Sequence, residues 1–128
     1  MNPAELEKIQ ALVERNPAYH FDAYLFVLSA LNLVLSEYRE KRHISGVELL
    51  EGIKVLGRNL YGRLAVEVFR HWGVNSTLDF GRIVFALVEF GMLRKRAEDT
   101  LEEFEAVYDF EDVFINNYEL PSNKLTKA

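Results

Sequence analysis

Apolar residues recur at helical spacing through most of the chain. From Leu6 to Val13 they return every three or four positions, which predicts an amphipathic helix over residues 3–15. Residues 22–39 carry two adjacent apolar rows, a pattern typical of a helix with a wide buried face. We expect Asp22 to be the N-cap of this second helix, because a short side-chain oxygen there can accept from free backbone N–H groups.

Start and stop signals divide the middle of the chain into three further helices. Ser45 and Glu48 have the spacing of a capping box, in which each side chain accepts a hydrogen bond from the other residue's backbone N–H. We expect helices over residues 45–61, 63–72 and 77–90. A glycine, the residue that most often terminates a helix, follows each of them: Gly62, Gly73 and Gly91.

The apolar period changes after the last of these glycines. Residues 92–96 and 104–110 suit short strands, and residues 97–103 between them suit a polar loop. In the second strand, alternate apolar residues share one face: Phe104, Ala106, Tyr108 and Phe110. A strand, a loop and a strand directly after a helix predict a β-hairpin over residues 92–110. The expected fold class is therefore mostly α with a small β-hairpin (α+β).

Three helices followed by a hairpin are the element order of a winged-helix domain. The junction at Gly91, where an apolar helix passes at once into a basic strand, favours the same fold. A generic α+β join of helix and hairpin stays open as the alternative. We expect one domain over residues 1–118, in which an N-terminal helical pair (1–42) packs on a winged-helix-like module (43–114), followed by a flexible tail over 119–128.

Four segments carry a resemblance to a known family: HISGVELLEGI (43–53), HWGV (71–74), DFGRIVF (79–85) and VYDF (107–110). In this order they resemble a conserved, uncharacterised family of small bacterial proteins of planctomycete and verrucomicrobial type. The resemblance covers roughly residues 20–114. Because that family has no assigned activity, the resemblance implies no catalytic or binding residue.

The charge of the chain is unevenly distributed. The net charge is −5, yet residues 97–114 hold eight acids and no base. The remainder holds all 15 Lys and Arg residues and 12 of the 20 Asp and Glu residues, a net charge of about +3. The acidic stretch is a candidate surface for a basic protein partner, because opposite charges steer association. Its members are Glu98, Asp99, Glu102, Glu103 and Glu105.

DNA binding by a winged helix is the alternative function. Such a protein contacts phosphates with a basic recognition helix and a basic wing. The expected recognition helix holds one base against two acids, and the expected wing is acidic, which repels the DNA backbone. Nucleic acid is therefore the less favoured partner. The candidate contacts in this alternative are Arg82, Arg94, Lys95 and Arg96.

Enzymatic chemistry finds no support in the sequence. The chain has no cysteine, and its three histidines, His20, His43 and His71, are scattered without metal-ligand spacing. No glycine-rich phosphate loop and no nucleophile elbow is present. We expect no enzyme, no metal and no cofactor. Whether His43 and His71 share a site stays open.

A non-enzymatic protein-interaction or regulatory module is the function that these observations favour. The expected partner is a protein, and a homodimer is left open. The expected location is the cytoplasm, because the chain lacks cysteine and an apolar leader at its start. We expect no membrane association, because the longest apolar-rich stretch, residues 24–35, is too short to span a bilayer.

Overall fold

The computed structural model describes residues 2–38 and 42–117 of the chain. Within these ranges it contains five α-helices: α1 (Pro3–Arg15), α2 (Phe21–Leu35), α3 (Gly46–Tyr61), α4 (Ala65–His71) and α5 (Thr77–Glu89). Three short helical turns accompany them: η1 (Gly62–Leu64), η2 (Leu101–Phe104) and η3 (Asp112–Asn116). The predicted tail over 119–128 lies outside the described residues.

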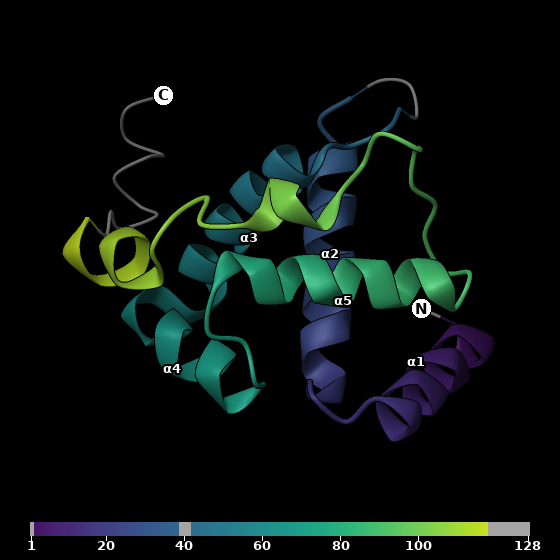
Figure 1. Ribbon diagram of the computed structural model, residues 1–128. Helices are drawn as coiled ribbons and strands as arrows, with labels where there is room; N and C mark the ends of the chain where they lie inside the picture. The colour runs from purple at the N-terminus through teal and green to yellow at the C-terminus, as the bar shows by residue number, and fades with distance from the viewer. Residues whose placement is uncertain (1, 39–41, 118–128) are drawn as a thin grey trace.

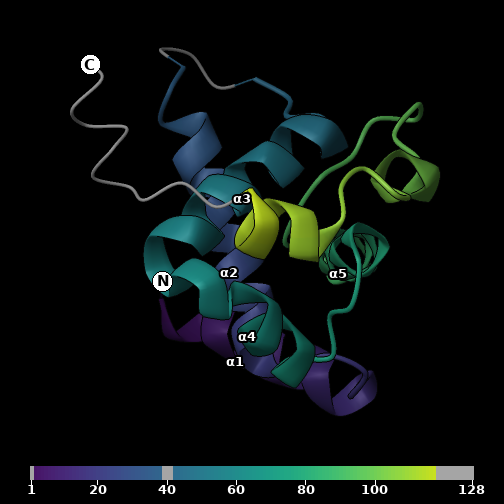
Figure 2. The same cartoon turned by 90° about the vertical axis from the view of Figure 1, so that its left-hand side faces the viewer.

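Helix α2 lies at the centre of the fold. Helix α5 crosses in front of it, α3 lies beside its C-terminal half, and α1 and α4 lie near its N-terminal end (Figure 1). In the view turned by 90°, α5 is seen nearly end-on, and α1 and α4 lie together at one end of the fold (Figure 2). One hydrophobic core joins all five α-helices to η2 and η3. Its fully buried side chains include Tyr24, Leu50, Ile53, Phe69, Phe80 and Phe114.

Close contact between α2 and α3 depends on Gly52. A Cβ atom at this position would lie 2.4 Å from Val34 Cγ2 and 3.3 Å from the Ala30 carbonyl oxygen. Gly52 therefore lets the two helices approach each other, which explains a helix-weakening residue in the middle of α3. This contact fixes the start of α3 relative to the end of α2, where the candidate site lies.

The predicted helices are largely confirmed, with shifted ends. The capping box at the start of α3 is present: the Ser45 N–H donates to Glu48 Oε1 (3.0 Å), and the Glu48 N–H donates to Ser45 Oγ (3.2 Å). The predicted N-cap of α2, Asp22, is wrong: His20 is the N-cap, its Nδ1 accepts from the Asp22 N–H, and α2 begins at Phe21 with Asp22 in its first turn. It ends at Leu35, four residues before the predicted end.

The predicted helix over residues 63–72 is divided. Gly62 has a left-handed φ of 55° and begins the short turn η1, after which α4 starts at Ala65. A left-handed residue ends the regular hydrogen-bond ladder, so the chain must change direction before a new helix begins. The predicted helix over residues 77–90 is confirmed as α5, one residue shorter.

The predicted β-hairpin over residues 92–110 is wrong. No residue in the ranges 2–38 and 42–117 lies in a β-strand. The backbone N–H groups of Met92 and Leu93 donate to the Leu87 carbonyl at the end of α5 (2.9 and 3.3 Å) instead of to a second strand. The described part of the chain is thus all-helical, and the α+β class is not supported.

The apolar alternation in residues 104–110 has a different cause. Phe104 and Phe110 are buried, but Ala106 between them is exposed and has a φ of 50°, which a regular strand does not allow. Fully buried Thr77 donates its hydroxyl to the Phe104 carbonyl (2.6 Å) and accepts from the Val107 N–H (3.2 Å). A threonine side chain thus satisfies the backbone groups that a strand partner would take, and the winged-helix-like module is likewise not supported.

Candidate binding pocket

The candidate site is a pocket of about 270 Å³ between α2, α3, α5 and the segment over residues 92–104. Apolar side chains from four parts of the chain line it: Leu31 and Leu35 from α2, Leu49 from α3, Val84 and Phe85 from α5, and Phe104 from η2. Polar side chains stand at its mouth: Arg42, His43, Arg94, Lys95, Asp99 and Glu103. An apolar floor with a few convergent polar groups is the usual composition of a binding pocket.

Phe104 forms one wall of this pocket because two glycines leave room for its ring. A Cβ atom at Gly81 would lie 2.6 Å from Phe104 Cγ, and one at Gly46 would lie 3.0 Å from the far edge of the ring. The aromatic side chain therefore fills the space between the first turn of α3 and α5. This placement holds η2 across the top of the core and leaves the pocket open beside it.

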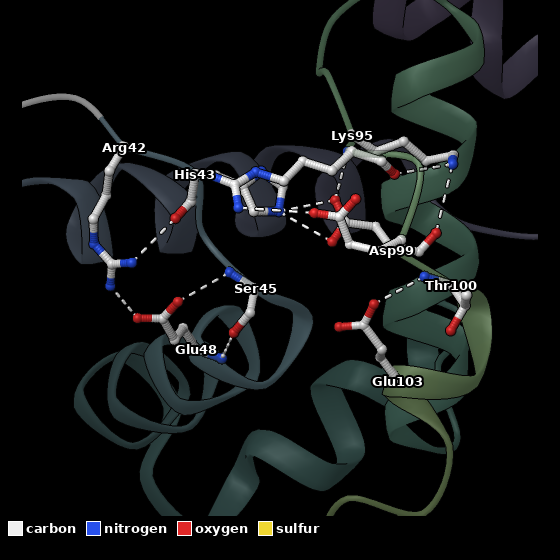
Figure 3. A network of polar contacts seen from close by, with 10 residues as sticks. Arg42, His43, Ser45, Glu48, Lys95, Asp99, Thr100 and Glu103 are labelled. Atoms are coloured by element: carbon white, nitrogen blue, oxygen red, sulfur yellow. Dashed lines mark hydrogen bonds and ion pairs between the residues drawn. The ribbon is translucent and has the colours of Figure 1, made fainter.

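His43 and Asp99 join the two sides of the mouth. His43 Nε2 lies 2.8 Å from Asp99 Oδ2 and 3.1 Å from Asp99 Oδ1, although 56 positions separate the two residues. Figure 3 shows His43, from the segment before α3, pointing across to Asp99 in the segment after α5. The Arg96 N–H also donates to Asp99 Oδ2 (2.7 Å). Burial raises the pKa of Asp99, but the Arg96 N–H and His43 outweigh it and hold the pKa below its ordinary value.

A second group of polar contacts organises the start of α3. Glu48, besides capping Ser45, accepts hydrogen bonds from Arg42 and from the Tyr38 hydroxyl. The Ser45 N–H and the Arg42 guanidinium lower the pKa of Glu48 to about 2. The Arg42 guanidinium also lies over the Tyr38 ring, 3.9 Å from its centroid. Arg42 is thus engaged within the chain, although it stands at the mouth of the pocket (Figure 3).

Arg94 and Lys95 differ from Arg42 in their contacts. Lys95 Nζ lies near two main-chain carbonyl oxygens, at 3.3 Å from Arg96 and 3.5 Å from Asp99, and 5.8 Å from the centroid of the Phe85 ring, but no carboxylate pairs with it in the described ranges. Arg94 is exposed, and no hydrogen bond or ion pair joins it to another residue in the described ranges. The mouth therefore carries two cationic side chains whose donors are largely available to a ligand.

The predicted acidic partner surface is divided by the structure. Asp99 and Glu103 turn to the pocket mouth, where Glu103 Oε1 accepts from the Thr100 N–H (2.8 Å). Glu98, Glu102 and Glu105 are exposed, and Glu98 lies 3.8 Å from the Arg96 guanidinium. Two of the five acids therefore already make contacts with other residues of the same chain. The other three remain a predicted partner surface without a second feature to support them.

The candidate nucleic-acid contacts do not all gather at one place. Arg94 and Lys95 line the pocket, whereas Arg82 lies on α5 outside the pocket lining. Arg82 is 3.3 Å from Asp79, whose other oxygen accepts from the N–H of Asn75 in the turn before α5 (2.8 Å). In the part of the chain that the structure describes there is no wing, so the DNA-binding alternative loses the hairpin on which it depended.

The histidines are separated. His43 stands at the pocket mouth, while the rings of His71 and His20 lie 5.8 Å apart at the other end of α2. His43 and His71 therefore share no site. Among the described residues, no group of three or more histidine and carboxylate side chains is placed to hold a metal ion.

Sequence reasoning missed the pocket itself. Its floor consists of residues that a sequence assigns to the core, and nothing local distinguishes a core residue that borders a cavity from one that does not. One available signal was the excess of apolar residues on α2 and α5, where Leu31, Leu35 and Phe85 stay only partly buried. Partly exposed apolar side chains beside a core are a common mark of a binding surface.

Comparison of the chain with protein-family models, with curated proteins and with solved structures gave no match. The resemblance to a family of small bacterial proteins therefore stays a prediction. Across the described residues, no helix is long and apolar enough to cross a membrane. Any functional assignment therefore depends on the pocket and its polar mouth.

Proposed function

We propose that this chain is a non-enzymatic interaction module that holds a bulky apolar side chain of a protein partner in the pocket between α2, α3 and α5. The observation that carries the proposal is an apolar cavity that the chain leaves unfilled and open at a polar mouth. Hot spots of protein interfaces are bulky apolar groups set in such pockets and surrounded by polar contacts. The proposal keeps the cytoplasm as the location, because a chain without cysteine fits a reducing compartment.

A titration of the isotope-labelled chain with phenethyl alcohol tests the pocket. This neutral aromatic probe should shift backbone amide resonances at the pocket, among them those of Ile44, Gly46 and Leu93. The variant Val84→Phe adds a ring inside the cavity and should weaken binding. Val55→Phe is the matched control, because it adds the same ring to an exposed position of α3 that does not line the pocket.

The proposal is wrong if the probe shifts no pocket amide, or if both variants bind it as well as the unmodified chain. If Val84→Phe does not fold, Leu93→Phe fills the cavity from the loop instead. A partner protein recovered with the chain must then be purified and measured against both variants. It should bind the cavity-filling variant about tenfold more weakly, a loss of ~1.4 kcal/mol, and the control equally well.

A further inference from the structure

The mouth of the pocket holds more available donors than acceptors. Arg94 has no ion-pair or hydrogen-bond partner among the described residues, and its guanidinium presents several N–H groups in a planar fork. Lys95 contacts only uncharged groups: two carbonyl oxygens, at 3.3 and 3.5 Å, and the face of the Phe85 ring, 5.8 Å from its centroid. Neither cation is neutralised by a carboxylate of the chain within ion-pair distance in the described ranges.

The two carboxylates at the mouth are already occupied. Asp99 accepts from His43 Nε2 and from the Arg96 N–H, at 2.8 and 2.7 Å. Glu103 accepts from the Thr100 N–H, and the turn η2 depends on this contact (Figure 3). A cationic ligand would have to compete with these internal donors, whereas an anionic ligand would meet donors without a strong partner. The charge of the mouth therefore selects for a carboxylate.

The volume of the cavity indicates how much of the ligand it encloses. At about 270 Å³ it lies below the range of roughly 300 to 1,000 Å³ that encloses most of a drug-sized ligand. It is the volume that about nine water molecules take in the liquid. The cavity thus fits one bulky apolar group, and the rest of the bound molecule lies outside, where Arg94 and Lys95 stand.

We infer that the partner segment is acidic: it places one bulky apolar side chain in the pocket, and flanking Asp or Glu carboxylates contact Arg94 and Lys95. This inference rests on the proposed function and names the chemistry of the partner. Arginine is suited to this contact, because its fork matches the two oxygens of a carboxylate. The apolar anchor supplies affinity, and the carboxylates supply specificity and a faster association.

A series of aromatic probes that differ in charge tests the inference. Phenylacetate, phenethyl alcohol and phenethylamine carry the same ring with an anion, a neutral group and a cation. We expect phenylacetate to bind about three- to tenfold more tightly than the alcohol, the gain that one or two exposed ion pairs of up to ~1 kcal/mol provide. The amine should bind most weakly.

Paired variants assign this preference to the mouth. Arg94→Gln with Lys95→Gln should remove the preference for phenylacetate over the alcohol. Arg70→Gln with Lys8→Gln is the matched control, because it removes two exposed cations that do not line the pocket. A preference that both double variants reduce equally would be an effect of net charge, and it would overturn the inference.

Short peptides then distinguish a protein segment from a free acid. A capped peptide with one phenylalanine among glutamates should bind more tightly than the same peptide built with lysines. If phenylacetate binds in the pocket and the acidic peptide does not, the ligand is a small amphipathic acid and the inference of a protein segment is wrong. If the alcohol binds and the acid has no advantage, the inference fails while the pocket stands. If no probe binds, the proposed function itself fails.

Discussion

Two buried tyrosines, Tyr19 and Tyr24, and one partly buried tyrosine, Tyr108, differ in what their hydroxyl groups contact. The Tyr19 hydroxyl donates to Asp79 Oδ1 at 2.5 Å, and that of Tyr108 donates to the Leu50 carbonyl at 2.7 Å. The Tyr24 side chain is fully buried, and its hydroxyl has no hydrogen-bond partner among the described residues. Replacing each by phenylalanine removes one oxygen atom and leaves the ring packing intact. The three substitutions therefore isolate the value of the hydrogen bond.

The structure sets the order of the three effects on the free energy of unfolding. Tyr19→Phe removes a bond to a charged acceptor and should lower it by about 1.5 to 3 kcal/mol. Tyr108→Phe removes a bond to a neutral carbonyl and should lower it by about 0.5 to 1.5 kcal/mol. Tyr24→Phe removes a buried hydroxyl without a partner, so it should leave the free energy unchanged or raise it by up to ~1 kcal/mol.

Urea unfolding followed by tryptophan fluorescence measures these differences. The chain has a single tryptophan, Trp72, which packs against Phe26 and Phe69 in the core and so reports loss of the tertiary structure. The slope of the transition should stay the same in all three variants, because the exposed area hardly changes. A loss for Tyr24→Phe as large as that for Tyr19→Phe would refute the reasoning, because it would show that the Tyr24 hydroxyl is bonded.

Three other predictions concern packing and pH. Gly81→Ala should lower the free energy of unfolding by about 1 to 3 kcal/mol in denaturant titrations, although alanine favours helices, because its Cβ would meet the Phe104 side chain; a stabilised variant would contradict this contact. Burial, and at Tyr19 also Asp79, raises the pKa of Tyr19 and Tyr24 from 10.0 to about 12 in the folded chain. The folded state therefore keeps both hydroxyls protonated where the unfolded chain would lose the protons, and its free energy of unfolding should be constant below pH 10 and fall between about pH 10 and 12 in pH-dependent melting. The Ser45 N–H and Arg42 lower the pKa of Glu48 from 4.5 to about 2; its contribution should be complete above pH 4.5 and lost as the pH falls toward 2, and Glu48→Gln should lack that part of the acid transition.

The presence of the five helices, and some of their ends, follow from the sequence alone. Helical hydrogen bonds and caps join residues within about one turn, so the pattern that predicts them is local. Ser45 and Glu48 form their capping box as predicted, and Gly62 ends α3 as predicted. The apolar stripes also identified most of the core, because a residue on the inner face of an amphipathic helix must be buried for the helix to be stable.

Residues 92–110 show what the sequence could not determine. A strand is stable only when a second strand satisfies its backbone, and alternation of apolar residues does not say whether such a partner exists. In residues 92–110 the backbone groups bond instead to the Leu87 carbonyl and the Thr77 hydroxyl. The Phe104 ring packs against Gly81, where no side chain occupies the space. These contacts come from α5, and they outweigh the local preference for strands.

The candidate site is likewise a product of tertiary structure. The sequence could not say which acidic and basic residues contact one another, because those contacts form only when the fold brings distant segments together. Asp99, expected on a partner surface, pairs with His43 from a segment 56 positions away, while Arg94 and Lys95 remain available at the mouth. A cavity is the space that helices distant in sequence leave between them, so it depends on their packing and not on any local pattern.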